Sequence, residues 1–117
     1  MTVKRIVFDI ATGDVAGVQD FYRALFDLTP VMDQGFIVTL ASGTEAPVQV
    51  SIASEGGSGT PVPDASIEVE DVDATYARAT RMGCEIVYDL TDEPWGVRRF
   101  FLRDPAGKLL NVLAHRD

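Results

Sequence analysis

A chain of 117 residues is long enough for one domain that buries about two-thirds of its unfolded surface. Its composition is that of a globular protein, with 46% hydrophobic and 24% charged residues, and no apolar run approaches the roughly 20 residues of a membrane span. The 10 Lys and Arg against 18 Asp and Glu give a net charge of -8, which disfavours nucleic acid and anionic membranes as partners. We therefore expect a neutral or cationic small molecule as the partner.

Two features indicate a cytoplasmic protein. The first residues, "MTVKRIVFDI", contain no apolar stretch of the length that a signal peptide needs. The single cysteine, Cys84, has no partner for an intrachain disulfide. We expect Cys84 to be a small packed residue rather than a nucleophile, because no histidine is expected near it.

The first half of the chain predicts a strand, a helix and a pair of strands. The segment "VKRIVFDI" alternates in hydrophobicity with the two-residue period of a strand. Asp14 is expected to cap a helix over "DVAGVQDFYRALFD", and Pro30 follows its end. The runs "GFIVTLAS" and "PVQVSIAS" then predict a hairpin.

The second half repeats this order after a linker rich in Gly, Ser and Pro, "EGGSGTPVP" at residues 55–63. A strand, "DASIEVE", precedes a helix that Asp71 caps and Gly83 ends, and "CEIVYDL" and a final hairpin follow. Asp104 lies in the turn of that hairpin, "DPAG". The repetition predicts one domain of two βαβββ modules, about 3–54 and 64–115, with eight strands, two helices and the α+β class.

Strand parity separates two faces of the predicted sheet. The helices are expected to bury one face, with the apolar sets Ile6/Phe8/Ile10, Val48/Val50/Ile52, Ala65/Ile67/Val69, Phe100/Leu102 and Leu110/Val112. The opposite face carries Val7, Asp9, Gln49, Ser51, Asp64, Ser66, Glu68, Leu109, Asn111 and Leu113. A flat sheet would leave this second face solvated, whereas a curled sheet would make it the lining of a cavity.

The segments "FYRALFDL" and "PWGVRRFFLRDPAGKLLNVLAH" resemble the glyoxalase/bleomycin resistance/dioxygenase superfamily, the vicinal oxygen chelate fold. The resemblance covers nearly the whole chain. It implies that the eight-stranded mixed sheet curls into an incomplete barrel with the helices on its convex face. It also implies that the concave face binds a ligand, and that a second copy closes the open flank to form a homodimer.

Enzymes of that superfamily usually hold a divalent metal with His and Glu side chains on the concave face. The resemblance places the ligand positions on Val7, Asp64 and Asn111, and in the first hairpin on either Gln49 or Ser51. Valine cannot ligate a metal, and an amide binds a transition metal poorly. His115 is expected to be an exposed tail residue. We therefore expect no metal and no cofactor, as in the metal-free branch whose bleomycin-resistance proteins sequester an antibiotic without altering it.

Three further residues are candidates for the ligand site. Trp95 is expected either to cover the pocket as a flap or to plug the sheet edge. Arg99 is the one basic group expected on the concave face, where Glu68 either pairs with it or binds a cation. Phe101 is expected to form an aromatic wall. The full predicted ligand-binding set is Val7, Asp9, Gln49, Ser51, Asp64, Ser66, Glu68, Trp95, Arg99, Phe101 and Asn111.

Three functions are consistent with these features. The first is a protein that sequesters a small cationic or aromatic molecule, such as an antibiotic. The second is a lyase or dioxygenase-like enzyme with a metal held by carboxylates such as Asp9, Asp64 and Glu68. The third is an accessory domain that only dimerises. The count of metal-ligating side chains favours the first.

Overall fold

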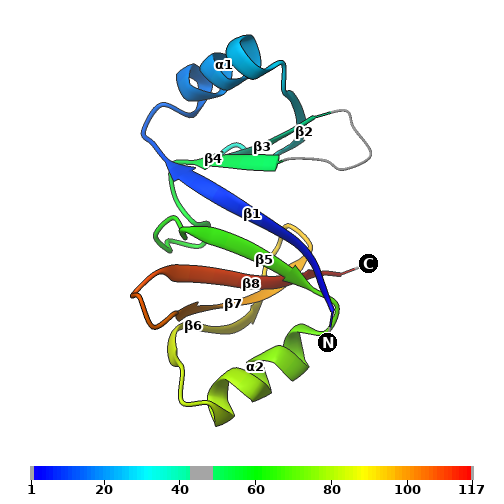
Figure 1. Cartoon of the computed structure of the whole chain (residues 1–117), viewed down its shortest axis with the longest axis vertical. Helices are drawn as coiled ribbons and strands as arrows, with labels where there is room; N and C mark the ends of the chain where they lie inside the picture. The colour runs from blue at the N-terminus through cyan, green and yellow to red at the C-terminus, as the bar shows by residue number, and fades with distance from the viewer. Residues whose placement is uncertain (1, 43–48, 117) are drawn as a thin grey trace. The chain divides into compact units, whose positions relative to one another are not determined.

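The computed structural model describes residues 2–42 and 49–116 and contains the two helices and eight strands that the sequence predicts (Figure 1). Their order matches two βαβββ modules. The elements are β1 (Val3–Ala11), α1 (Val15–Phe26), β2 (Thr29–Asp33), β3 (Ile37–Ala41), β4 (Gln49–Ala53), β5 (Ala65–Val69), α2 (Val72–Arg81), β6 (Glu85–Asp92), β7 (Val97–Arg103) and β8 (Leu109–His115). The chain divides into two compact units, Val7–Val62 and Met1–Ile6 with Pro63–Asp117.

In the unit Val7–Val62 the strand order is β2-β3-β4-β1, with β1 parallel to β4 and the other pairs antiparallel. Asp14 begins α1 as predicted, since its Oδ1 accepts a hydrogen bond of 2.9 Å from the N–H of Gly17. The sequence did not predict the residues of β2. This strand contains Pro30 and pairs only with β3, which fits a proline that cannot donate to a second neighbour.

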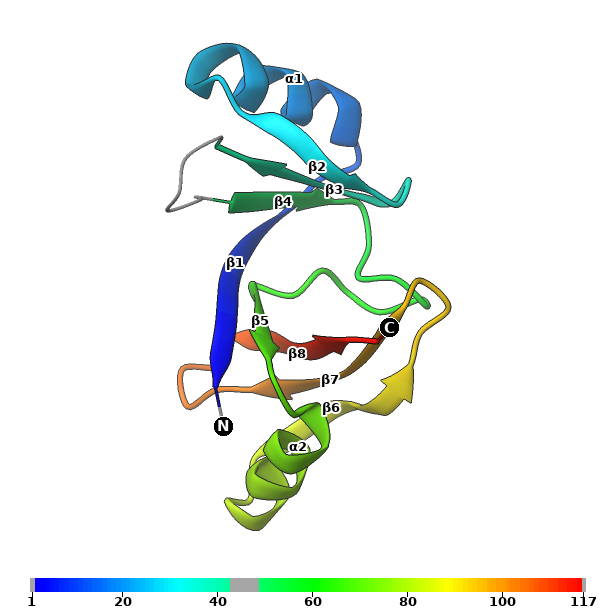
Figure 2. The ribbon, with the colours of Figure 1, turned by 90° about the vertical axis from the view of Figure 1, so that its right-hand side faces the viewer.

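In the unit of Met1–Ile6 and Pro63–Asp117 the strand order is β5-β8-β7-β6, with β5 parallel to β8 (Figure 2). Asp71 caps α2 through a hydrogen bond of 3.0 Å from the N–H of Ala74. Gly83 follows the end of α2 with a φ of 75°, which glycine adopts without strain. Phe100 is fully buried beneath α2, and the ring of Tyr76 meets it edge to face at 5.1 Å.

The predicted fold class is confirmed. Each unit combines one parallel pair with antiparallel pairs, so the sheet is mixed. The strands do not close into a barrel, because β2 pairs only with β3 and β6 pairs only with β7. Each helix packs on the strands of its own module, α1 against β3 and β4 and α2 against β6, β7 and β8.

The helix-side cores agree with the predicted parity except in β1. Val50 and Ile52 are buried in one unit, and Val69, Phe100 and Val112 in the other. The expectation that Ile6 and Phe8 belong to the core is wrong, since they are 65% and 53% exposed. Of the predicted set on β1, Ile10 packs against the core of Val38, Leu40, Val50 and Ile52, and α1 packs on β3 and β4. Val48 lies outside the described residues.

The predicted linker at residues 55–63 is an ordered loop. The N–H of Gly56 donates to Thr60 O at 2.8 Å, and the N–H of Thr60 donates back to Gly57 O at 3.0 Å. A Cβ on Gly56 would lie 2.2 Å from Pro61 O, so only glycine fits at this position. The composition of the segment thus reflects the geometry of a tight loop.

Asp104 is a turn residue, as predicted. Its Oδ1 accepts hydrogen bonds from the N–H groups of Ala106 at 2.8 Å and Lys108 at 2.9 Å.

Among the described residues, neither α1 nor α2, of 12 and 10 residues, is long enough to cross a membrane.

Candidate functional site

The candidate site in the unit of Pro63–Asp117 is the sheet face that turns away from α2. Successive residues of a strand point to opposite faces, so Phe100 and Leu102 pack toward α2 while Arg99 and Phe101 lie on the other side. Asn111 is the register partner of Phe101 and shares its face. Arg99, Phe101 and Asn111 are all buried.

Arg99 forms a buried ion pair with Glu93. The Nε of Arg99 lies 2.6 Å from Oε2 of Glu93, and the two side chains are 4% and 3% exposed. The hydroxyl of Tyr88 donates to the same carboxylate oxygen at 3.1 Å. The turn between β6 and β7 fixes Glu93, whose N–H donates to Val97 O at 2.7 Å. This carboxylate therefore balances the charge of Arg99 inside the protein.

Three aromatic rings surround the guanidinium of Arg99. Its Cζ lies 4.8 Å from the ring centroid of Phe101, 5.0 Å from that of Trp95 and 5.3 Å from that of Tyr88. These distances are within the range of cation–π attraction. The aromatic residues thus already hold a cation that belongs to the chain itself.

Asn111 has one satisfied and one unsatisfied amide atom. Its Nδ2 donates to Oγ of Ser66 at 3.1 Å, on the neighbouring parallel strand. Its Oδ1 is buried and has no hydrogen-bond partner, although the residue is only 9% exposed. An unpaired buried carbonyl costs about 1–3 kcal/mol. This makes Asn111 the candidate for a hydrogen bond to a ligand that donates N–H or O–H.

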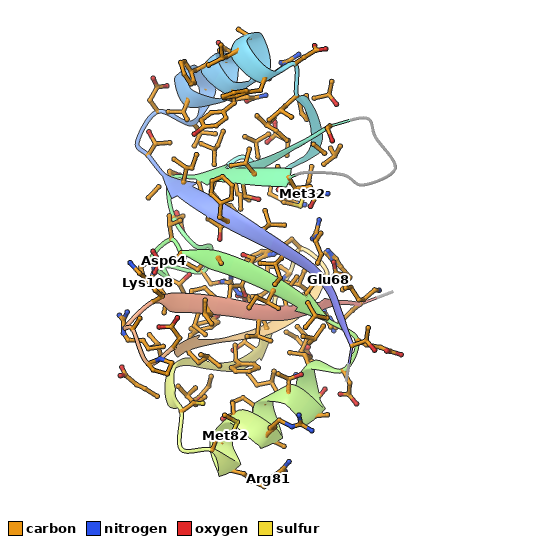
Figure 3. The ribbon with its side chains drawn as sticks, viewed as in Figure 1. Met32, Asp64, Glu68, Arg81, Met82 and Lys108 are labelled. Carbon is orange, nitrogen blue, oxygen red and sulfur yellow. The ribbon has the colours of Figure 1, made fainter. Side chains whose placement is uncertain are left out.

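Two of the predicted carboxylates have partners inside the same unit. Oε1 of Glu68 lies 3.1 Å from Nε of Arg5, and its Oε2 lies 3.9 Å from Nζ of Lys4. Oδ2 of Asp64 accepts the N–H of Leu109 at 2.8 Å, at the start of β8 (Figure 3). The structure therefore pairs Glu68 with Lys4 and Arg5 of β1, whereas the prediction offered either Arg99 or a bound cation.

The remaining predicted residues belong to the unit Val7–Val62. Val7 is buried, and Asp9 and Ser51 are register partners on the parallel strands β1 and β4. The hydroxyl oxygens of Ser51 and Thr39 lie 2.7 Å apart and share a buried hydrogen bond. Gln49 lies two residues from Ser51 on β4, so it shares that strand face.

Sequence reasoning missed Glu93, Tyr88 and Thr39. Glu93 lies in the turn "EPWG", where a carboxylate is normally solvated, so its burial had no sequence signal. Tyr88 follows a register shift in β6, which breaks the alternation that parity reasoning needs. Thr39 follows the alternation of β3, and the expected hairpin with β4 could have revealed it as the partner of Ser51.

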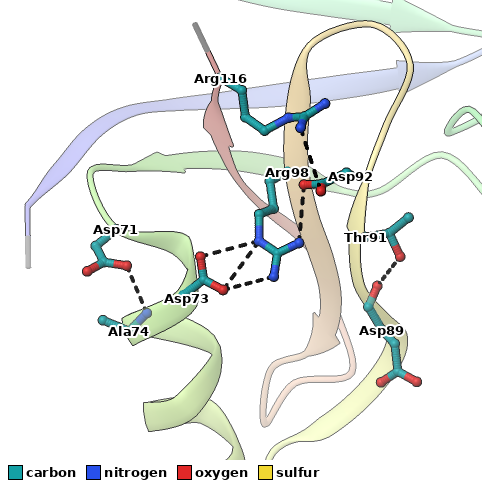
Figure 4. A network of polar contacts seen from close by, with 8 residues as sticks. All are labelled: Asp71, Asp73, Ala74, Asp89, Thr91, Asp92, Arg98 and Arg116. Carbon is teal, nitrogen blue, oxygen red and sulfur yellow. Dashed lines mark hydrogen bonds and ion pairs between the residues drawn. The ribbon is translucent and has the colours of Figure 1, made fainter.

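A charged cluster links α2 to the hairpin of β6 and β7 on the sheet face opposite Arg99 (Figure 4). The guanidinium of Arg98 bonds Asp73 of α2 at 2.9 Å and Asp92 of β6 at 3.1 Å. The hydrogen bond from Arg98 holds the pKa of Asp73 below its ordinary value, and the hydrogen bonds to Asp73 and Asp92 raise the pKa of Arg98. Since neighbouring residues of β7 face opposite ways, this cluster is separate from the Arg99 pair.

The side chains at the expected metal positions do not suit a metal ion. Val7 has no donor atom, Asp64 accepts a backbone N–H, and Asn111 offers a single amide oxygen. Within residues 2–42 and 49–116, no three His, Cys, Asp or Glu side chains gather at metal-binding distances. His115 is exposed at the end of β8.

Comparison with known proteins gives a family and a fold. The sequence profile of the Glyoxalase/Bleomycin resistance protein/Dioxygenase superfamily matches residues 3–112. No curated protein sequence matches the chain.

Three solved structures share the fold at low sequence identity. A glyoxalase/bleomycin resistance protein/dioxygenase superfamily member from Vibrio splendidus 12B01 is 19% identical with a TM-score of 0.66, over 97% of this chain and 99% of that one. Methylmalonyl-CoA epimerase from Streptomyces coelicolor is 21% identical with a TM-score of 0.70, over 99% and 100%. A structure described as NAD-dependent benzaldehyde dehydrogenase from Legionella pneumophila is 14% identical with a TM-score of 0.78, over 96% and 100%.

Proposed function

Since the chain belongs to the glyoxalase/bleomycin resistance protein/dioxygenase superfamily, we propose that it binds a small aromatic molecule without a metal ion and leaves it unaltered. The observation that carries this proposal is Asn111, whose Oδ1 is buried without a partner. The resemblance to the superfamily assigns this position to a metal ligand. An acceptor in this environment gains a hydrogen bond only when a donor on a ligand reaches it.

The surroundings of Asn111 favour an aromatic ligand. Phe101 is its register partner on β7, and Trp95 stacks on Arg99 in the same unit. Aromatic rings bind flat ligands by stacking, a contact that requires no charge. Because Asn111 is only 9% exposed, a ligand reaches it only after the side chains that cover it move.

The charges of the site give less support to a strongly cationic ligand than the sequence did. Glu68 is paired with Arg5, Asp64 accepts an N–H, and the aromatic rings already surround Arg99. We therefore place the aromatic character of the ligand before its charge. A cationic group on the ligand would add an attraction that salt weakens, since the chain carries a net charge of -8.

The alternative function, a metal-dependent lyase or dioxygenase, needs several free carboxylates around one ion. Methylmalonyl-CoA epimerase, which has the same fold, is an enzyme. In this chain the carboxylates of Asp64 and Glu68 already have partners, and this favours binding without chemistry.

A binding screen with product analysis tests the proposal. The purified protein is incubated with a panel of aromatic antibiotics that includes bleomycin, and thermal shift and calorimetry report binding. Mass spectrometry of the recovered ligand should show an unchanged mass. A recovered ligand of altered mass would show that the protein is an enzyme. Equal ligand affinity of Asn111→Leu and the wild type would show that Asn111 is not part of the binding site.

A further inference from the structure

A second candidate binding site lies on the other side of the same sheet, at the C-terminal end of α2. A groove of about 590 Å³ opens there between α2, the start of β6 and the turn after β7. We call it the α2 groove. Its apolar lining consists of Ala79, Met82, Cys84, Leu102 and Pro105. The volume is within the range of about 300–1,000 Å³ that is usual for small-molecule sites.

The α2 groove is separate from the face that carries Asn111. Leu102 lines the groove and packs with the core beneath α2, whereas its neighbour Phe101 lies on the opposite sheet face. On α2, Thr75, Arg78, Ala79 and Met82 recur at helical spacing and form one wall of the groove.

Part of the apolar lining of the groove is exposed to solvent. Met82 is 72% exposed at the end of α2, where Figure 3 shows it beside Arg81. Cys84 is half-buried against the core and also lines the groove. An exposed thioether beside a concave apolar wall suits a flexible hydrocarbon, because methionine adapts its shape to a partner.

The charges at the rim of the groove leave one cation without a partner. Arg103 pairs with Glu85 at 3.6 Å and donates to Gly107 O at 3.0 Å. Asp104 accepts two backbone N–H groups of its own turn. Among the described residues, the guanidinium of Arg78 has no hydrogen bond or ion pair. Arg78 is therefore the group on the rim with which an anion can pair, although Asp104 keeps its charge and the chain as a whole is acidic.

Hydrogen bonds within the turn reduce the number of open carbonyls at the end of α2, where the helix dipole disfavours an anion. The O atoms of Arg78, Ala79 and Thr80 accept the N–H groups of Met82, Cys84 and Gly83, at 2.9, 3.0 and 3.1 Å. These bonds occupy three of the four carbonyls that a helix end otherwise exposes.

We propose that the α2 groove binds an amphipathic carboxylate of the fatty-acid type, with its hydrocarbon chain along the apolar lining and its carboxylate at Arg78. Apolar burial supplies most of the affinity, and the guanidinium selects the anionic head. This site extends the proposed function to a second ligand class and requires neither Asn111 nor Arg99.

Decanoate, below its micelle concentration, is the probe. Calorimetry should show binding to the wild type and weaker binding of decanol, which has the same chain without the charge. Arg78→Gln should weaken decanoate about threefold to fivefold, the range for a solvent-exposed ion pair. Arg81→Gln is the matched control, since it removes the same charge from the same helix without lining the groove, and it should bind like the wild type.

Cys84 reports whether the probe occupies the groove. Bound decanoate should slow the alkylation of its thiol by N-ethylmaleimide, and Met82→Glu, a change at an exposed residue, should abolish that protection. Asn111→Leu should leave decanoate binding intact, which separates this proposal from the proposed function. Equal binding of decanoate and decanol, equal affinity of Arg78→Gln and Arg81→Gln, or unchanged alkylation at saturating decanoate would each overturn it.

Discussion

Oε2 of Glu93 lies 2.6 Å from Nε of Arg99, and both side chains are almost completely buried. The pair joins the β6–β7 turn to the middle of β7, and the rings of Tyr88, Trp95 and Phe101 surround its cationic half. The chain thus contains its own cation in an aromatic enclosure of the kind that other proteins use for a ligand.

Breaking this pair should be costly, while removing both charges should not. Arg99→Met leaves the Glu93 carboxylate buried without its partner, and we expect it to lower the free energy of unfolding by about 3–5 kcal/mol. The double variant Arg99→Met/Glu93→Gln should recover most of that loss. Urea unfolding of the two single variants and the double variant measures the coupling, and strictly additive losses would argue against the pair.

We expect Asn111 to lower the stability of the folded protein and to contribute to ligand affinity. Replacing it with leucine removes a buried carbonyl without a partner, so we expect Asn111→Leu to be as stable as the wild type or more stable, and to lose ligand affinity. Thr39→Val is the comparison, because its hydroxyl shares a hydrogen bond with Ser51, and it should lose about 1 kcal/mol. Thermal unfolding and calorimetry of both variants test this, and a large loss of stability in Asn111→Leu would assign Asn111 a structural role.

The purified protein should contain no stoichiometric Zn, Fe, Ni or Mn. The resemblance to the superfamily assigns metal-ligand positions to Val7 and Asn111, neither of which suits a transition metal, and Asp64 accepts the N–H of Leu109. A chelator should therefore leave the melting temperature unchanged, since no metal stabilises the folded state. Elemental analysis that finds close to one metal ion per chain would contradict this.

The ion pair between Arg98 and Asp73 should make stability depend on acid. The folded pKa of Asp73 is below its ordinary value of 3.8, so the pair stabilises the protein above that value and the contribution disappears as the pH falls through the lowered pKa. Asp73→Asn should melt below the wild type at neutral pH, and the difference should shrink in acid and in high salt. Asp20→Asn, which removes an exposed carboxylate from α1, is the control. A difference that does not change with pH would exclude the ionic explanation.

The protein should form a homodimer. The resemblance to the superfamily predicts it, and β1 exposes Ile6 and Phe8, two large apolar side chains that a second copy could bury. Light scattering should give a dimer mass for the wild type and a monomer mass for Phe8→Lys. Val87→Lys, at a less exposed apolar residue of β6, should remain dimeric. A monomer mass for the wild type at micromolar concentration would end this prediction.

Much of the fold could be predicted because local signals decide it. The side chains of Asp14 and Asp71 cap their helices, and the turn at Asp104 follows from its own backbone hydrogen bonds. Alternation also assigned Phe100 and Phe101 to opposite faces. Alternation gave Ile6 and Phe8 the same face as Ile10, but it carries no information about how far along β1 the core extends, and both residues are exposed.

The candidate site was less predictable than the fold. Parity placed Arg99, Phe101 and Asn111 on one face, but it could not identify the partner of a charged side chain. Glu93 lies in a turn, outside the strand positions that parity compares. Arg5 lies on β1 with the same parity as Val7 and Asp9, but parity gives no distance between Arg5 and Glu68. The partner of a long charged side chain depends on distances in the folded protein, so these two ion pairs could not be predicted from the sequence.

The parallel pairing within each module has a consequence for synthesis. β5 pairs with β8, which places Ala65 beside Leu110. The first strand of this module therefore cannot pair until the last strand has been synthesised. During translation the hairpin of β7 and β8 can form only after β8 has left the ribosome, and β5 has no neighbour from its own module until then. A nascent chain stalled before β8 should therefore keep β5 and α2 accessible to proteases and chaperones, and loss of the last strand should prevent the module from folding.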